Sequence, residues 1–297
     1  MTYSIAEAER LTGIKAHTLR IWEKRYDFLV PERTDTNIRF FSDDQLRKLI
    51  NVSILIQNKH RISTIARMDD DEINQTVSGI LTSDDTSHDE IIKALVMSML
   101  KLDEAEFNNI FNRQILKQGL VNTILHIIYP FLEQVGVLWG TNKVLPAQEH
   151  FTSNLIRQKL ISAFESLPQP APDAPKIVLF LLEDENHEIA LLLGAFIAKD
   201  LGWKVYYLGQ NVPSEDIATL VDYLNPRLLM TMFIIPRPKK RDDSFCEMLV
   251  EKNMTLLYGG NPKSFPCTMA SENFVAIKNP NHFIDFLNHS LATMKEV

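Results

Sequence analysis

The C-terminal part of the chain alternates uniformly apolar runs with amphipathic stretches, and this alternation constrains the fold more than any other feature. The apolar runs are expected strands at 176–182, 204–208, 228–235, 254–258 and 274–277. The stretches between and after them are expected helices at 188–201, 214–224, 244–252 and 282–294. Strands that are apolar throughout are buried on both faces, as in a parallel sheet between helical layers. The pattern therefore predicts an α/β doubly wound parallel sheet over residues 176–297.

Polar residues stand where some of these strands end. Glu185, Asn186 and His187 follow the first strand, and Gly259-Gly260 end the fourth, while Thr231 lies in the third. Open α/β sheets bind ligands at the carboxyl ends of their strands. A neutral imidazole can ligate a metal, a nearby carboxylate can orient it, and glycines admit close approach. Taken alone, these residues also suit an ordinary loop, and no nucleotide-binding glycine motif accompanies them.

The middle of the chain, 88–167, has helical periodicity. Apolar stripes at 91–99, 107–116, 124–138 and 151–164 predict four amphipathic helices with short joints, which form a four-helix bundle. Pro130 should kink the third helix, and Pro146 suits the first turn of the fourth. Trp139 ends the third helix and Glu149-His150 begin the fourth, so they should share one end of the bundle. Taken alone, these residues are more simply explained as a core tryptophan and a glutamate that the helix dipole favours.

The N-terminal segment is basic within an acidic chain. The whole protein has a net charge of −7, yet residues 10–67 contain twelve Lys and Arg against six Asp and Glu. Capping boxes at Ser4–Glu7 and Ser42–Gln45 predict two helix starts, a glycine turn follows Thr12, and 28–41 has the pattern of a small hairpin. The segment therefore predicts a winged helix-turn-helix. Arginines on a protruding hairpin suit phosphate neutralisation, although a solvated surface is the plain alternative.

Residues 3–7, 11–14, 17–26 and 37–42 resemble the DNA-binding domain of the MerR family of transcription regulators. The resemblance implies that four side chains lie against the major groove and its phosphates: Thr18, Arg20, Lys24 and Tyr26. It also implies that Arg33 and Arg39 bring the wing to the backbone or minor groove. Many MerR regulators dimerise through a coiled coil after the wing. Here the wing is followed by an acidic run at 68–72, a short helix ending near Leu81 and a polar stretch. None of these has heptads, so self-association should come from the domains that follow.

The spacing from Trp139 to Glu149-His150, with its flanking residues 129–139 and 149–153, is similar to the helical domain of the CarH-type cobalamin-dependent photoreceptor repressors. In that family the bundle covers the upper face of adenosylcobalamin. The resemblance implies that Trp139 packs beside the adenosyl group and that Glu149 and His150 line the same space.

The C-terminal segment resembles the cobalamin-binding domain shared with methionine synthase and the mutases, whose pattern is Asp/Glu-x-His-x-x-Gly, Ser-x-Leu and Gly-Gly. The resemblance implies that His187, two residues after Glu185, ligates cobalt, and that the cofactor's own base enters a slot beside Thr231 and Gly259-Gly260. Two departures concern that slot. Ala190 replaces the motif glycine, and the Ser-x-Leu site ends in Phe233. Overpacking of this kind costs about 1 to 3 kcal/mol.

These observations divide the chain into a DNA-binding domain (1–75), a linker (76–87), a helical bundle (88–167), a proline-rich linker (168–175) and a cobalamin-binding-like domain (176–297). We expect a non-enzymatic transcription regulator that binds double-stranded DNA as a homo-oligomer. It should act as a repressor that is controlled by adenosylcobalamin and light. The main alternative is a cobalamin-independent MerR-type regulator whose C-terminal domains mediate protein association. A corrinoid methyl carrier is a third.

Cellular location and cysteine chemistry follow from composition. No apolar stretch reaches membrane-spanning length and no leader pattern begins the chain, so we expect a cytoplasmic protein without membrane contact. The two cysteines, Cys246 and Cys267, have neither disulfide-framework nor zinc-site spacing. We expect both to be reduced and structurally neutral.

Overall fold

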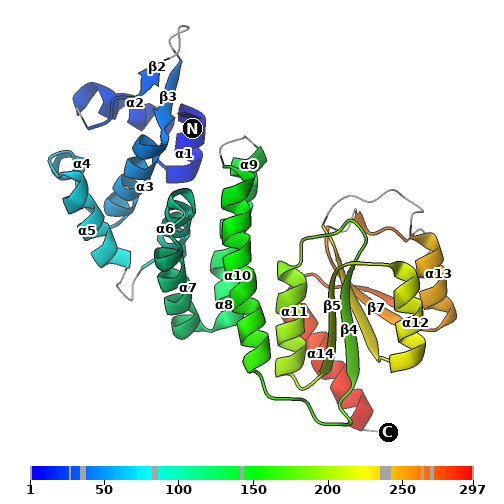
Figure 1. Cartoon of the computed structure of the whole chain (residues 1–297). Coiled ribbons are helices and arrows are strands. Elements are labelled where there is room, and N and C mark those ends of the chain that lie inside the picture. The colour runs from blue at the N-terminus through cyan, green and yellow to red at the C-terminus, as the bar shows by residue number, and fades with distance from the viewer. Residues whose placement is uncertain are drawn as a thin grey trace. The chain divides into compact units, whose positions relative to one another are not determined.

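A computed structural model describes residues 2–26, 28–33, 38–81, 86–140, 144–234, 242–261, 264–267 and 271–295 (Figure 1). By their internal contacts these residues form two compact units, Met1–Leu155 and Ile156–Val297. The boundary between the units falls inside one long helix, α10 (Pro146–Ser166). The Pro-rich segment 168–175 follows that helix and contains no helix or strand.

The first unit begins with the predicted winged helix-turn-helix. Its helices are α1 (Ile5–Thr12), α2 (Ala16–Arg25) and α3 (Asp43–Gln57), and its strands are β1 (Thr2–Ser4), β2 (Glu32–Arg33) and β3 (Arg39–Ser42). Both predicted capping boxes form, at Ser4 and at Ser42, and Gly13 ends α1 with a φ of 73°. The sheet has the order β1-β3-β2 and is antiparallel. Strand β1 was not predicted, because three residues directly before a helix are too few to show a period of two.

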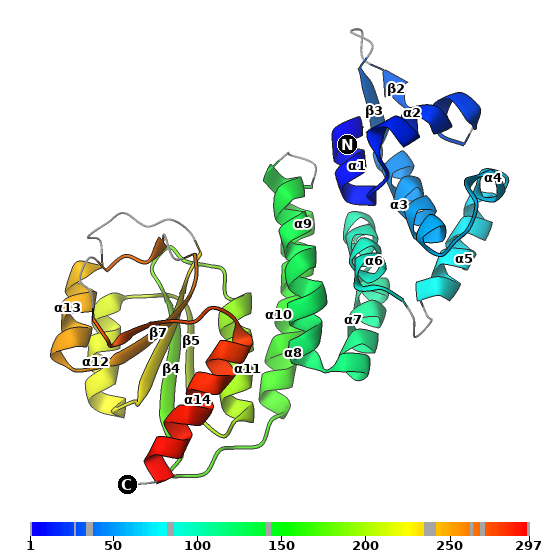
Figure 2. The same cartoon turned by 180° about the vertical axis from the view of Figure 1, so that it is seen from behind.

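Helices form the rest of this unit (Figures 1 and 2). They are α4 (Ile62–Ile65), α5 (Asp70–Leu81), α6 (His88–Lys101), α7 (Glu104–Gln118), α8 (Leu120–Thr123), η1 (Ile124–Ile128), α9 (Tyr129–Gly140) and the start of α10. The edge-to-face rings of Phe107, Phe111 and Phe131 lie in their core. The predicted linker 76–87 begins inside α5, and its residues 82–85 lie outside the described part of the chain.

The third predicted helix contains a π-helical turn directly before Pro130, the residue at which a kink was expected. The amide of Tyr129 donates to the carbonyl of Ile124, five residues back, and η1 ends immediately before Tyr129-Pro130. Proline has no N–H and its ring crowds the carbonyl four residues earlier, so the ladder must widen there.

The second unit contains the predicted parallel sheet. Its strands β4 (Lys176–Leu182), β5 (Lys204–Val212), β6 (Leu228–Phe233), β7 (Thr255–Gly260) and β8 (Phe274–Ala276) lie in the order β5-β4-β6-β7-β8. All four pairings are parallel. The helices α11 (Ile189–Asp200) and α14 (Pro280–Lys295) cover one face, and α12 (Ser214–Leu224) and α13 (Asp243–Glu251) cover the other (Figures 1 and 2).

Two details of this unit differ from the sequence prediction. Strand β5 continues past Leu208 to Val212, because bulges opposite Leu179 and Phe180 let it keep pairing with β4. The cysteine prediction was wrong, since Cys246 of α13 and Cys267 form a disulfide with a Cα–Cα distance of 5.8 Å. The two cysteines are 21 positions apart in the sequence, with β7 between them, and this spacing gives no hint that they meet.

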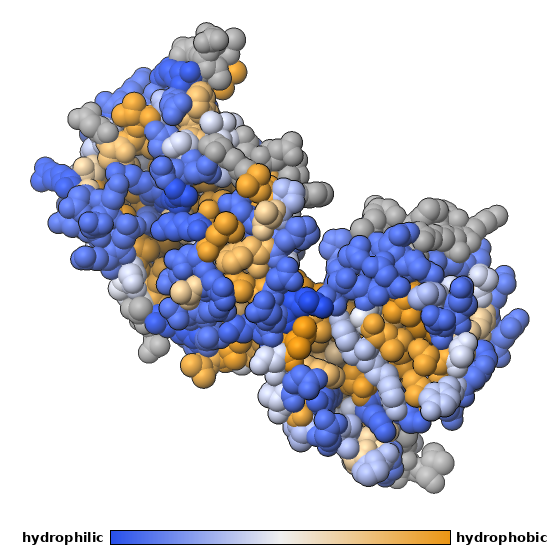
Figure 3. Space-filling view, viewed as in Figure 1, coloured by the Kyte–Doolittle hydropathy of each residue, from blue (hydrophilic) through white to orange (hydrophobic). Residues whose placement is uncertain are grey.

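The surface of this unit is mixed. Figure 3 shows hydrophilic side chains over most of the helices and a hydrophobic area between α11 and α12, where β5 forms the edge of the sheet. No helix in the described ranges is both long and apolar enough to cross a membrane.

Candidate functional sites

The loop between β4 and α11 is organised by one buried carboxylate. Glu185 is 1% exposed, and its Oε1 accepts the backbone amides of Asn186 and His187 at 3.0 and 3.1 Å. The same oxygen lies 2.6 Å from Nδ1 of His187. Its other oxygen, Oε2, accepts the amide of Ile234 at the end of β6 at 2.9 Å. Glu185 therefore joins the His187 loop to the neighbouring strand and fixes the orientation of the imidazole.

This orientation determines which ring nitrogen can bind a metal. A neutral histidine that donates its Nδ1 proton to Glu185 carries its lone pair on Nε2. The His187 side chain is 56% exposed. A carboxylate behind an imidazole is the usual outer support of a metal-binding histidine. Among the described residues no cluster of three or more His, Cys, Asp or Glu could hold an ion.

Two polar residues of β5, which the sequence analysis missed, hold the loop from the other side. The Asn211 side chain accepts the amide of Asp184 at 3.0 Å and donates to Oδ1 of Asn186 at 2.7 Å. Gln210 donates to the Asn186 carbonyl at 2.8 Å. Asn211 has a positive φ of 54°, a conformation that asparagine tolerates better than most residues. The only sequence signal was an asparagine beyond the expected end of the strand.

A second buried carboxylate follows directly after His187. Glu188 accepts hydrogen bonds from Nε of Arg157, on α10, and from the hydroxyl of Tyr207, on β5, the latter at 2.7 Å. Burial, and then the hydrogen bond to Glu188, raise the pKa of Tyr207 well above its usual value, so the phenol keeps its proton. The network links the His187 loop to the part of α10 that belongs to the same unit. Its members are far apart in the chain, so no sequence motif connects them.

The expected slot beside Thr231 and Gly259-Gly260 is wrong in one respect. Successive side chains of a strand point to opposite faces of the sheet. A side chain at Gly259 would meet Met232, so Met232 and Gly259 share a face and Thr231 lies on the other. Thr231 is fully buried there, and its hydroxyl has no hydrogen-bond partner within the described segments. Thr231 and Gly259 therefore lie on opposite faces of the sheet and do not line one slot.

Gly260 is required by its backbone. Its φ is 98°, and a Cβ there would lie 2.5 Å from the carbonyl oxygen of Phe233. The amide of Asn261 donates to that same carbonyl at 2.8 Å. This close approach fixes the end of β7 against the end of β6.

The candidate residues of the helical region lie near the α9–α10 connection. Trp139 is in the last turn of α9, and its side chain is outside the described part of the structure. Glu149 is in the first turn of α10, where it accepts a hydrogen bond from Ser153. Nδ1 of His150 lies 3.3 Å from Glu149, and the His150 side chain is 72% exposed.

Helix α2 presents most of the residues expected at the major groove. Its inner face buries Leu19 and Trp22, as predicted. Arg20 and Lys24 are exposed on the outside, while Thr18 and the C-capping Tyr26 are half-buried. This combination anchors the helix and leaves its basic side chains accessible.

The two wing arginines are held by one carboxylate of α2, which the sequence analysis did not predict. Arg33 donates from Nη2 to one oxygen of Glu23 and Arg39 donates from Nε to the other, both at 2.6 Å. Partial burial raises the pKa of Glu23, but the hydrogen bonds from Arg39 and Arg33 outweigh it and leave that pKa below its usual value. The wing is therefore tied to α2 by charge-assisted hydrogen bonds.

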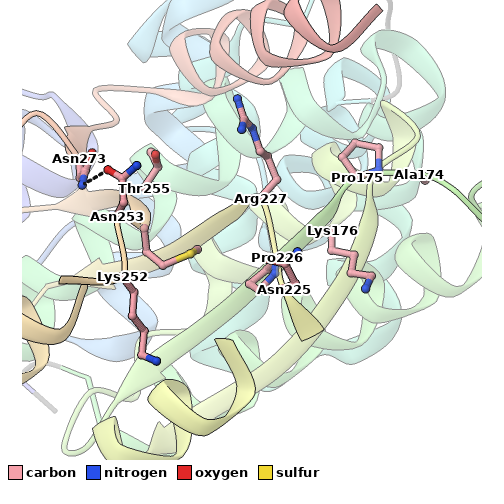
Figure 4. Close-up of a pocket in the computed structure, with 11 residues that line it drawn as sticks. Ala174, Pro175, Lys176, Asn225, Pro226, Arg227, Lys252, Asn253, Thr255 and Asn273 are labelled. Atoms are coloured by element: carbon pink, nitrogen blue, oxygen red, sulfur yellow. Dashed lines mark hydrogen bonds between the residues drawn. The ribbon is translucent and has the colours of Figure 1, made fainter. Parts of the chain in front are cut away.

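A cavity of about 630 Å³ lies at the opposite edge of the sheet from His187. Figure 4 shows Lys176, Arg227 and Lys252 around it, at the amino ends of β4, β6 and β7. The cations do not converge on one point in that view. Lys176 donates to the carbonyl of Leu224, and Lys252 pairs with Asp222. The cavity is thus separate from the His187 loop.

Comparison with family models separates the chain into two matched segments. The model described as "MerR HTH family regulatory protein" matches residues 3–72, and the model described as "B12 binding domain" matches residues 91–162. The first covers the winged helix-turn-helix. The second covers the helical region from α6 into α10, including Trp139, Glu149 and His150.

Two curated relatives match most of the chain. The HTH-type transcriptional repressor CarH of Myxococcus xanthus is 27% identical over 76% of this chain and 76% of its own length. The repressor CarA of the same organism is 26% identical over 83% of this chain and 82% of its own length. Among solved structures, the monomethylamine corrinoid protein of Methanosarcina barkeri has a TM-score of 0.53 and 14% identity, covering 69% of this chain and 100% of that one. That likeness concerns the fold alone.

Proposed function

We propose that this protein regulates transcription through a corrinoid bound at His187. The chain joins a MerR-type helix-turn-helix to a B12-binding domain and is homologous to the repressors CarH and CarA. The observation that carries the proposal is the Glu185–His187 pair. It presents one oriented imidazole without a cluster of further metal ligands in the described ranges. A single protein ligand suits a metal already held by a macrocycle.

The residues of this loop have distinct roles in the proposal. Nε2 of His187 would bind the cobalt of a cobalamin, which supplies a light- and ligand-sensitive metal centre. Glu185 keeps the proton on Nδ1 and so preserves the lone pair on Nε2. Asn211 keeps the loop in place through Asn186. Glu188 links the loop to Arg157 on α10, the helix whose first turn carries Glu149 and His150.

The finer features of the proposal rest on the resemblance to the CarH type. They are adenosylcobalamin as the cofactor, Trp139, Glu149 and His150 as contacts of its adenosyl group, light as the signal, repression as the output and a homo-oligomer as the active form. As a transcription regulator, the protein would act in the cytoplasm and would not need to catalyse a reaction. The names of both relatives support repression.

The DNA contacts are proposed on the side chains of the first unit. Arg20 and Lys24 are exposed on α2, with Thr18 and Tyr26 beside them. Arg33 and Arg39 extend the basic surface along the wing. Phosphate contacts by such residues supply most of the affinity and make it fall with salt.

One observation favours the alternative of a cobalamin-independent regulator. The thioether of Met232 fills the space in front of Gly259, at the sheet edge where a cofactor base was expected. If no corrinoid can enter, the C-terminal unit would serve protein association only.

Absorption spectra of the full chain, reconstituted with adenosylcobalamin in the dark, test the proposal. The wild type should retain cobalamin with a histidine-ligated spectrum, and His187→Ala should lose the cofactor or shift the spectrum. His289→Ala, an exposed histidine of α14, is the matched control and should behave like the wild type. Failure of the wild type to retain cobalamin, or a spectrum unchanged by His187→Ala, would refute His187 ligation.

A further inference from the structure

Two methionines of β6 fill spaces that glycines leave open. A Cβ at Gly259 would lie 2.6 Å from Sδ and 3.3 Å from Cε of Met232. A Cβ at Gly194, on α11, would lie 3.0 Å from Cε of Met230. Both methionines are buried, at 7% and 2% exposure. They lie on the sheet face that α11 and α14 cover, and Met232 is the one next to the carboxyl edge.

Met232 is also close in the chain to the support of His187. Ile234, two residues later, donates its amide to Glu185, and Glu185 holds Nδ1 of His187. Strand β6 lies between β4, which leads into the His187 loop, and β7, which ends in Gly259-Gly260. The space that Met232 occupies is therefore the space on this face beside the His187 loop.

A methionine can leave such a space more readily than other core residues. Its side chain is unbranched, has three rotatable bonds and adapts to irregular gaps. A branched residue or an aromatic ring at this position would close the space permanently. The bare α-carbon of Gly259 gives an incoming planar group close access to the backbone once the thioether has moved.

On the basis of the proposed function, we infer that Met232 closes the slot for the nucleotide base of a corrinoid, and so makes the site discriminate against corrinoids that carry one. Cobalamin has such a base, which must leave the cobalt when His187 binds and must then occupy another place. Cobinamide has the same ring and cobalt but no base. Cobalamin must displace Met232, and cobinamide need not.

The experiment compares the affinities of the full chain for hydroxocobalamin and cobinamide, measured by spectroscopic titration in the dark. The quantity is the ratio of the two dissociation constants, because a general change in folding or in His187 alters both alike. Met232→Ala should improve cobalamin binding about tenfold relative to cobinamide, as expected when an overpacked group is removed. Gly259→Ala should oppose it, weakening cobalamin and leaving cobinamide less affected.

Met230→Ala is the matched control. It removes the same side chain from the same strand and face, but against Gly194, farther from the carboxyl edge. Its ratio should stay within about twofold of the wild type. Thermal unfolding monitored by circular dichroism identifies any variant that fails to fold, and Met232→Leu, which retains volume but adds a branch, then provides the second test. It should disfavour cobalamin further.

The outcomes separate this inference from the proposed function. An unchanged ratio in both Met232 variants, with cobinamide still bound, overturns the role of Met232 and leaves His187 ligation intact. Cobalamin binding that appears only in Met232→Ala supports the role of Met232 but contradicts the proposed function, because the wild type then binds no cobalamin. If no variant binds either corrinoid, both the inference and the proposed function are wrong.

Discussion

Two carboxylates, Glu23 in the first unit and Glu185 in the second, each hold side chains on which function is proposed to depend. Glu23 pairs with Arg33 and Arg39, and its side chain is 14% exposed, with the arginines at 39% and 23%. Glu185 is 1% exposed and bonds backbone amides as well as His187. Partly exposed ion pairs exchange partners at little cost, whereas breaking a buried one leaves donors unsatisfied.

The difference teaches what each contact is suited to do. The arginines of the wing can leave Glu23 for DNA phosphates, because water and phosphate replace the lost interaction. The buried carboxylate of Glu185 is held in place by three backbone amides, so it keeps a fixed position behind the imidazole of His187. We infer that the wing contact is exchangeable and that the His187 contact is a fixed support.

The largest effect is expected for Glu185→Ala. The substitution leaves the amides of Asn186, His187 and Ile234 without their acceptor, at about 1 to 3 kcal/mol for each buried donor that water does not reach. We expect the free energy of unfolding to fall by about 3 kcal/mol, measured by urea denaturation. Asp184→Asn, an exposed neighbour with a positive φ that asparagine accepts, should change it by less than about 0.5 kcal/mol. Equal effects would contradict a buried support.

A smaller effect is expected for Glu188→Gln. The amide keeps the shape of the side chain but removes the negative charge to which Arg157 and Tyr207 donate hydrogen bonds. Because Arg157 is 47% exposed and can turn to water, we expect a loss of about 1.5 kcal/mol in unfolding free energy. Tyr207→Phe should account for about 1 kcal/mol of it. If Glu188→Gln costs as much as Glu185→Ala, burial alone does not distinguish the two supports.

Glu23→Gln should affect DNA binding more than stability. Removing the carboxylate releases Arg33 and Arg39 and adds one unit of positive charge to the binding surface. At low salt we expect a threefold rise, about 0.7 kcal/mol, in affinity for a duplex of random sequence, measured by fluorescence anisotropy. Arg39→Gln should lower that affinity and reduce the slope of its logarithm against log salt by about one. An Arg39→Gln slope equal to that of the wild type would exclude phosphate contact by Arg39.

The smallest effect concerns pH. The pKa of Glu23 is lowered in the folded chain, so its ion pairs stabilise the wing fully above the ordinary carboxyl pKa. That contribution is lost only as pH falls through the folded pKa. The difference in unfolding free energy between the wild type and Glu23→Gln should be constant from about pH 7 to about pH 5 and should shrink below about pH 4. A difference that shrinks near neutral pH would show that another group is responsible.

How much the sequence predicted depended on how local each feature is. Ser4 and Ser42 were predicted as helix caps because a capping box lies within four residues. The Glu185–His187 pair was predicted because its members are two residues apart. Glu23 was missed, since its partners reach it only when the wing folds against α2.

The expected slot shows the same limit at single-residue resolution. Successive side chains of a strand point to opposite faces of the sheet. A motif that is aligned one residue out of place is therefore assigned to the wrong face. Thr231 and Met232 differ by one position, and only the contact of Met232 with Gly259 assigns the face. Ala190 is half-buried in the first turn of α11. We therefore expect the thioether of Met232, and not the methyl group of Ala190, to obstruct the slot.

If a corrinoid at His187 controls DNA binding, adenosylcobalamin should change the affinity of the full chain for duplex DNA, measured in the dark with and without the cofactor. We expect cobalamin to change the dissociation constant of the wild type and of His289→Ala by about tenfold, within the usual range of coupling between sites. His187→Ala should show no such change. An equal response in His187→Ala, or no response in the wild type, would contradict the claim.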